Sequence, residues 1–251
     1  MKYHFASIIL MFSINLFGTA QVPDYLIIGK DTLRIHSNPL ETYFKTNPLD
    51  NSLIKSRSTA NWRGYVAYFK FLDNKLVVEN IYKEDYGSDS KQYFLISIYK
   101  EVFGDSPNFK CDFYSGLLVC PFGKLIEYVH MGYASIYEYY ELFEINNGLK
   151  INSKKFTGEE FQNFKIEYYK YFKTTEEYKT KLLEFRQMML ETEKSFEETN
   201  LFDTKENKKK PKENKYLKQK ELEYKIDKQT NSFMFFLLDD YIKTIEIPKK
   251  N

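Results

Sequence analysis

Short stretches in which apolar and polar residues alternate dominate the chain from residue 24 to about residue 150. Alternation with a period of two is typical of β-strands that bury one face. Turn residues separate these stretches, for example Gly29-Lys30 and Asp73-Asn74. The stretches that predict strands are 25–28, 32–35, 62–72, 76–82, the two halves of 111–120, 125–131 and 139–145.

Two segments of the same region have apolar residues at helical spacing instead. Pro39 stands at the first position of a short helix over 39–44, where its fixed φ is favourable. The segment 92–103 carries apolar residues three and four positions apart and ends before Gly104, a residue type that often follows a helix. Because the connections are short, we expect one α+β domain over 21–154, with a mainly antiparallel sheet and short helices.

The pattern changes after Lys154, where a helical extension over 155–204 is predicted. The sequences Thr157-Gly-Glu-Glu160 and Thr174-Thr-Glu-Glu177 each place a glutamate three residues after a hydroxyl. This is the capping box that begins many helices, so we expect one helix to start at each. The second helix then has one apolar stripe, formed by Tyr178, Leu182, Phe185, Met189 and Phe196.

The C-terminal part divides into a lysine-rich linker and a last segment. Residues 205–215 contain six lysines, one proline and no apolar residue, which is typical of a solvated linker. The alternative is a segment that binds an anionic surface such as lipid headgroups. Residues 216–251 resume a weak helical pattern, and their apolar run at 233–238 is predicted to be buried, either as a last helical turn or as a strand that returns to the sheet.

The N-terminal residues 1–20 have the pattern of a secretory signal peptide. Lys2 precedes a 13-residue apolar stretch, and the small residues Gly18-Thr19-Ala20 form a cleavage site that leaves Gln21 first. An uncleaved membrane anchor is the alternative, but this stretch would extend only about 20 Å as a helix, against about 30 Å of hydrocarbon. We therefore expect an extracytoplasmic protein, periplasmic or secreted, without a transmembrane segment after cleavage.

Overall composition restricts the partners. The formal net charge is +2, from 37 basic and 35 acidic residues, so the chain lacks the excess of positive charge that attracts nucleic acid. A hydrophobic content of 43% excludes a wholly disordered chain. We expect a globular protein that does not bind nucleic acid.

Export also changes the interpretation of the two cysteines, because an oxidising compartment permits a disulfide. A hairpin over 111–120 with Ser115-Gly116 at its turn would place Cys111 opposite Cys120. The sequence therefore predicts a possible local disulfide. The alternative is two small buried apolar residues.

Few residues have the spacing that catalysis requires. No metal-ligand pattern, glycine-rich phosphate loop or serine-hydrolase motif is present, so neither a metal nor another cofactor is expected. His130 shares a strand face with Tyr128 in the predicted strand and could act as an acid or base, or pack structurally on the sheet. Trp62 and Arg63 could form a stacking platform with a charged anchor; the alternative is a core aromatic residue beside an arginine paired with a carboxylate inside the fold.

Several short motifs resemble a family of small uncharacterised exported proteins of Bacteroidota. They include Trp62-Arg-Gly-Tyr65, Gly123-Lys-Leu125 and Tyr128-Val-His-Met-Gly-Tyr-Ala-Ser135, and the resemblance covers about residues 24–150. It implies a shared fold without a known activity. It also places four residues in motif positions as candidate binding residues: Trp62, Arg63, His130 and Tyr133.

The sequence favours an exported, non-enzymatic protein that binds another protein or a cell-envelope component. The reasons are the export signal, the absence of a catalytic pattern and the nearly neutral charge. Two alternatives stay open, an envelope hydrolase that uses His130 and an immunity or inhibitor protein. If Trp62, Arg63, His130 and Tyr133 line one concave pocket, a ligand site there is expected.

Overall fold

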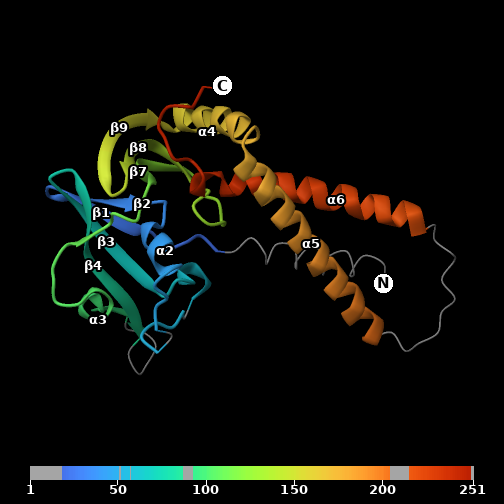
Figure 1. Ribbon diagram of the computed structural model, residues 1–251, viewed down its shortest axis with the longest axis horizontal. Coiled ribbons are helices and arrows are strands. Elements are labelled where there is room, and N and C mark those ends of the chain that lie inside the picture. Colours follow the sequence, from blue (N-terminus) through green and yellow to red (C-terminus); the bar gives the residue numbers. More distant parts are fainter. Residues whose placement is uncertain (1–18, 51, 57, 87–92, 204–214, 250–251) are drawn as a thin grey trace. The chain divides into compact units, whose positions relative to one another are not determined.

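The computed structural model describes residues 19–50, 52–56, 58–86, 93–203 and 215–249 (Figure 1). The predicted signal peptide up to residue 18 lies outside these residues, and so does the predicted linker at 205–215 except Lys215, which is helical. The strands are β1 (Asp24–Ile28), β2 (Asp31–Ile35), β3 (Tyr65–Leu72), β4 (Lys75–Tyr86), β5 (Tyr93–Ser97), β6 (Phe109–Lys110), β7 (Gly116–Glu127), β8 (Ile136–Asn146) and β9 (Leu149–Thr157). The helices are α2 (Pro39–Phe44), α3 (Tyr99–Phe103), α4 (Gly158–Phe172), α5 (Glu176–Asp203) and α6 (Lys215–Phe236), with 3₁₀ turns η1 (Thr59–Asn61) and η2 (Leu237–Asp240).

The fold is α+β, as the sequence predicts. Contacts divide the chain into two compact units, Met1–Asn163 with Ile242–Glu246 and Phe164–Tyr241 with Ile247–Asn251. The first contains the sheet, and the second is helical over the residues that the structure describes.

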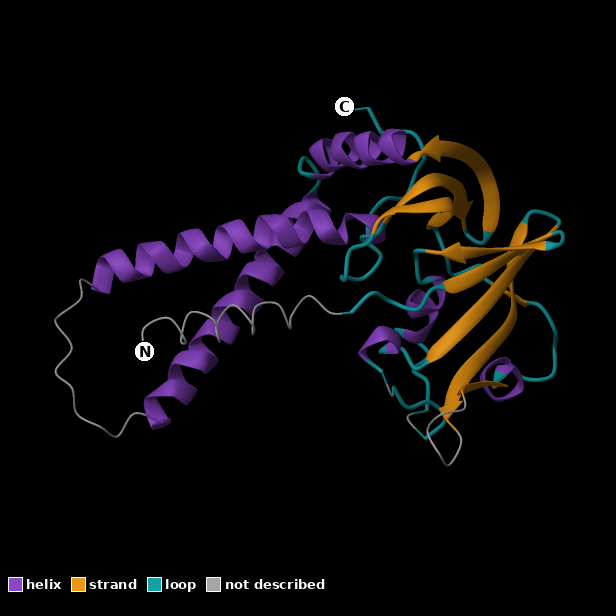
Figure 2. Cartoon of the chain, turned by 180° about the vertical axis from the view of Figure 1, so that it is seen from behind, coloured by secondary structure: helices purple, strands orange, loops and turns teal. Residues whose placement is uncertain are grey.

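The nine-stranded sheet has the order β2-β1-β3-β4-β9-β8-β7, with β5 and β6 also paired to β4. All of these pairs are antiparallel except β1 with β3, which the long crossover containing α2 makes parallel. The strands lie in two curved groups, β1–β4 and β7–β9 (Figure 2). The two groups also meet at β2 and β7, the first and last strands of this order. There the amide of His36, which follows β2, donates to the Val119 carbonyl of β7 at 2.7 Å.

The core lies on the inner face of this curved sheet. In β3 the side chains of Tyr65, Ala67 and Phe69 are buried, as the sequence pattern predicts, and Val66 between them is buried as well. Tyr65, Ala67 and Phe69 pack in one cluster with residues of the other strand group, such as Leu118 and Phe143. Burial of each large apolar side chain stabilises the fold by about 1.5–3 kcal/mol.

Two tight turns fix strand register, and the first of them, at Asp73-Asn74, is predicted from the sequence. Asp73 and Asn74 have φ of 49° and 63°, and Asn147 and Gly148 have φ of 45° and 75°. Positive φ at both central residues is the geometry whose twist matches a hairpin, and Asn and Gly tolerate it best. Gly148 is also required by space, since a Cβ atom there would approach the Cys111 carbonyl oxygen at 2.9 Å.

Two predictions of local structure are wrong. The segment 92–103 is not one helix: β5 pairs with β4, and only α3 is helical. The segment 111–120 is not a hairpin, because β6 before it pairs with β4 and β7 within it pairs with β8. In both cases the available strand partners, rather than the local apolar spacing, decide the structure.

The capping boxes begin helices near the predicted positions. At α4 the Thr157 hydroxyl accepts the Glu160 amide at 3.2 Å, while the Glu160 carboxylate accepts the Thr157 amide at 2.8 Å. At α5 the cap is Thr175, one residue later than predicted, and its hydroxyl accepts the Tyr178 amide at 3.1 Å. The apolar run at 233–238 is helical and forms the end of α6 and the start of η2, which excludes the alternative of a returning strand.

Candidate functional site

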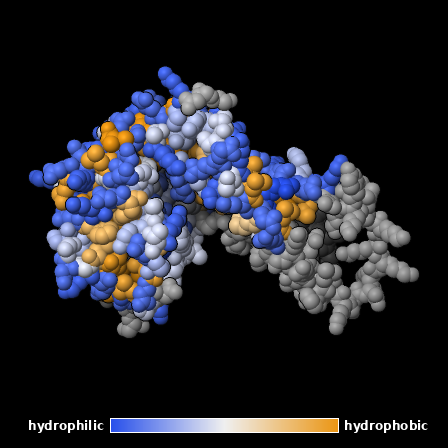
Figure 3. Space-filling model, in the orientation of Figure 1, coloured by the Kyte–Doolittle hydropathy of each residue, from blue (hydrophilic) through white to orange (hydrophobic). Residues whose placement is uncertain are grey.

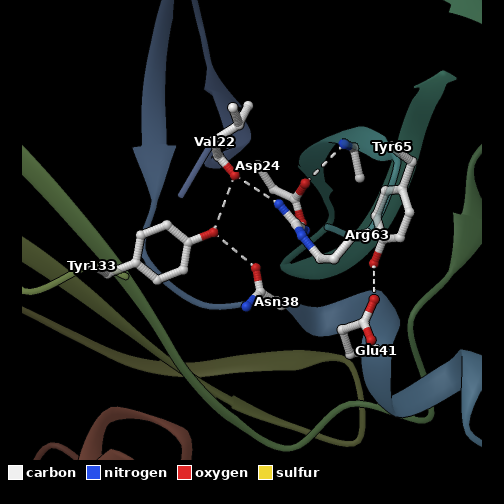
Figure 4. Close-up of polar contacts among 8 residues, drawn as sticks. Val22, Asp24, Asn38, Glu41, Arg63, Tyr65 and Tyr133 are labelled. Carbon is white, nitrogen blue, oxygen red and sulfur yellow. Dashed lines mark hydrogen bonds and ion pairs between the residues drawn. The ribbon is translucent and has the colours of Figure 1, made fainter. Parts of the chain in front are cut away.

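Arg63 forms a buried ion pair with Asp24 (Figure 4). Its Nη1 lies 2.8 Å from Asp24 Oδ2, and its Nη2 donates to the Val22 carbonyl at 2.8 Å. The second carboxylate oxygen of Asp24 accepts the Ala67 amide of β3 at 2.9 Å. The alternative in which Arg63 pairs with a carboxylate inside the fold is therefore the arrangement observed.

Burial and the contact between the two side chains both affect the pKa values of Asp24 and Arg63. Burial raises the pKa of the Asp24 carboxyl, while Arg63 and the Ala67 amide lower it. Burial lowers the pKa of Arg63, but the Asp24 carboxylate together with Tyr133 and Tyr65 outweighs this effect, so that the pKa of Arg63 is raised. The guanidinium stays charged and the buried Asp24 carboxylate balances its charge, so it is not available to bind a ligand.

Tyr133 joins the same network from the loop after β7. Its hydroxyl donates to Asn38 Oδ1 at 2.9 Å and lies 3.3 Å from the Val22 carbonyl that also accepts Arg63 (Figure 4). The Tyr133 ring stacks on His36, with centroids 4.7 Å apart. The structure therefore brings two of the four candidate binding residues together, Arg63 and Tyr133, in a network that links β1, α2 and this loop.

Tyr65 extends this network on the other side of Arg63. The guanidinium carbon lies 4.9 Å from the centroid of the Tyr65 ring, and the Tyr65 hydroxyl donates to Glu41 Oε1 of α2 at 2.7 Å. Burial raises the pKa of the Tyr65 hydroxyl well above its ordinary value. This phenol is a structural donor that holds α2 against β3.

The other two candidates, Trp62 and His130, are on the surface. The Trp62 side chain is exposed, at 55% of its full area. His130 is also exposed. It lies beyond β7, which ends at Glu127 and not at residue 131 as predicted. Its Nδ1 lies 2.8 Å from the Tyr128 hydroxyl, the neighbour that the sequence analysis named. The four candidates thus divide between a buried network and the exposed surface and do not line one pocket.

Cys111 and Cys120 are free thiols within the core. Burial raises the pKa of both, so neither is activated as a nucleophile. The disulfide prediction depended on the hairpin that the structure does not contain, and the alternative of two buried apolar residues is the arrangement observed.

A concave site lies elsewhere, on the outer face of β3, β4 and β5. This polar hollow is open to solvent and has a volume of about 470 Å³, and the loop 104–108 after α3 forms one of its sides. The Tyr99 hydroxyl fixes that loop, since it donates to the Ser106 carbonyl at 3.0 Å and accepts the Phe109 amide at 2.8 Å. The side chains that line the hollow include Lys70, Glu79, Asn80, Ser97, Tyr99 and Lys100.

The charged groups of the hollow are paired with one another. Lys70 and Glu79 form one ion pair across β3 and β4, and Lys100 and Asp105 form another at 2.7 Å. The Ser97 hydroxyl, also in the hollow, donates to Asn80 Oδ1 at 2.7 Å. The hollow therefore combines hydrogen-bonding groups with no net charge.

A row of tyrosines continues from this hollow across the outer sheet face. Asn80 Nδ2 donates to the Tyr82 hydroxyl at 2.9 Å. The Tyr82 and Tyr68 rings meet edge to face with centroids 5.4 Å apart, and Tyr68 stacks on Tyr25 at 4.9 Å. We call Tyr25, Tyr68 and Tyr82 the tyrosine row. No motif in the sequence marks this row, although these tyrosines occupy outward positions next to buried residues of the strands.

The described part of the chain offers no metal centre and no membrane helix. It contains no group of three or more His, Cys, Asp or Glu side chains that could hold a metal ion. Among the same residues, no helix combines the length and apolar character needed to cross a membrane. On the face in Figure 3, hydrophilic residues are interspersed with separate apolar patches.

Comparison with known proteins adds no relative. No family model matches the chain, and no curated protein or solved structure is significantly similar to it. The resemblance to exported proteins of Bacteroidota stays a prediction.

Proposed function

We propose that this protein is exported and binds a protein or another component of the cell envelope without catalysing a reaction. The observation that supports binding is the polar hollow beside the tyrosine row, a concave surface with donors, acceptors and aromatic rings. The N-terminal signal pattern supports the location.

The test uses the mature chain, starting at Gln21, immobilised and incubated with solubilised cell envelope. We expect the wild type to retain a component that the double variant Asn80→Leu/Lys100→Glu does not retain. Lys179→Glu is the matched control, because Lys179 also forms an exposed ion pair, with Glu176 on α5. Equal retention by wild type and double variant, or no retention above an empty matrix, would refute the proposal.

The hydrolase alternative predicts a different result. A panel of envelope substrates would then be turned over by the wild type, and His130→Gln would abolish turnover without changing the melting temperature. Such a result would replace the binding proposal.

A further inference from the structure

The charges of the polar hollow restrict the ligand that it accepts. Lys70 and Lys100 each have a carboxylate partner within the hollow, so its formal charges cancel. A phosphate or carboxylate ligand therefore gains no net electrostatic attraction from this surface. A neutral ligand does not need that attraction and can use both ion pairs as donors and acceptors.

The remaining polar groups suit a ligand with several hydroxyls. The Asn80 amide has two N–H groups, of which one donates to Tyr82, and its oxygen accepts Ser97 and the Ile81 amide. Ser97 is exposed and lines the hollow. Hydroxyls both donate and accept, so they match this mixture of groups better than a ligand that only accepts.

The tyrosine row supplies the apolar part of the surface. Its three rings are held by one another and by the sheet, and they are only partly buried. The C–H groups of a pyranose ring pack against aromatic rings, while its hydroxyls point outward to polar neighbours. Tyr25 and Tyr68 stack on each other, so sugar units next to the hollow would contact the parts of the three rings that these mutual contacts leave exposed.

We propose that the polar hollow and the tyrosine row bind a neutral oligosaccharide. The volume of about 470 Å³ lies within the range of small-molecule sites and accommodates a sugar unit, with further units along the row. This inference rests on the proposed binding function and names the chemical class of its ligand.

The experiment is calorimetric titration of the mature chain with cello-, malto- and chito-oligosaccharides. We expect at least one series to bind. Tyr68→Leu and Tyr82→Leu should each weaken binding about tenfold, because a ring contact is lost. The matched control is Tyr139→Leu on β8, whose partly exposed ring stacks on Phe122, and its affinity should equal that of the wild type.

Two further measurements keep the test independent of folding. Ser97→Ala removes an exposed hydroxyl from the hollow and should weaken binding several-fold even if a tyrosine variant unfolds. The affinity of the wild type should change less than about twofold between about 0.05 and 0.5 M salt, because screening does not act on a neutral ligand.

The inference is wrong if none of the oligosaccharides binds, if the affinity falls steeply with salt, or if Tyr139→Leu weakens binding as much as Tyr68→Leu. Failure of the inference is distinguishable from failure of the proposed function. If the envelope component still requires Asn80 and Lys100 but is destroyed by protease, the ligand is a protein and the binding function stands. If nothing is retained from the envelope, the binding function itself falls.

Discussion

At the scale of single residues, Arg63 is the best defined of the candidate binding residues. Its guanidinium contacts a carboxylate and a backbone carbonyl, and its side chain is 1% exposed. The sequence predicted Arg63 as a candidate binding residue, with the alternative that it pairs with a carboxylate inside the fold. It could not name Asp24, which is 39 positions away and becomes a neighbour only through the parallel pairing of β1 and β3.

This pair leads to a prediction of stability. Arg63→Met should destabilise the sheet-containing unit by about 3–5 kcal/mol, because it leaves the buried Asp24 carboxylate without its partner. The double variant Asp24→Asn/Arg63→Met should lose less than the sum of the single variants. Urea denaturation followed by Trp62 fluorescence measures both.

The control is Arg186→Met, which removes an ion pair with Asp227 whose side chains are 39% and 55% exposed. Its stability is measured by far-UV circular dichroism, because Arg186 belongs to the helical unit. Exposed pairs contribute about 0–1 kcal/mol, so this change should be small. Equal effects of Arg63→Met and Arg186→Met would show that the buried pair contributes no more than a surface pair.

At the scale of elements, the capping box of α4 makes stability depend on pH. The Thr157 amide and then its hydroxyl hold the pKa of the Glu160 carboxyl below its ordinary value of 4.5. A carboxyl with a lowered folded-state pKa stabilises the fold above its unfolded pKa, and this contribution is lost as the pH falls through the folded value. Glu160→Gln should therefore lower the melting temperature at neutral pH, and the difference from the wild type should shrink below about pH 4.5. Thermal melts by circular dichroism at several pH values test this, and a difference that does not change with pH would contradict it.

A turn or helix start can be predicted from the sequence when the residues that determine it lie close together in the chain. The turn at Asp73-Asn74 and the cap at Thr157 follow from residue types within four positions, and both form as predicted. The segment 92–103 has apolar residues that fit a helix or a strand, and β4 is long enough to accept β5 along its edge. The predicted hairpin over 111–120 is wrong for the same reason. β7 pairs with β8 over a greater length than it could pair with the few residues that precede it.

The same distinction explains why the polar hollow was missed. Its residues come from β3, β4, β5 and the loop after α3, and no short motif contains them. The sequence predicts β5 as part of a helix, so one of the strands that line the hollow is absent from the predicted sheet. The outward tyrosines of β1, β3 and β4 were the only local signal, because such positions in a solvated sheet face usually carry charged or small polar residues.

At the scale of the whole molecule, the division into two compact units predicts two unfolding transitions. Trp62 is the only tryptophan and belongs to the unit with the sheet, whereas most helical residues belong to the other unit. Trp62 fluorescence therefore reports one unit and far-UV circular dichroism mainly the other. Arg63→Met should lower the urea midpoint by fluorescence and leave the helical midpoint nearly unchanged. If both midpoints fall together, the two units unfold as one cooperative system, because the loss of a single buried ion pair in the sheet then destabilises the helices equally.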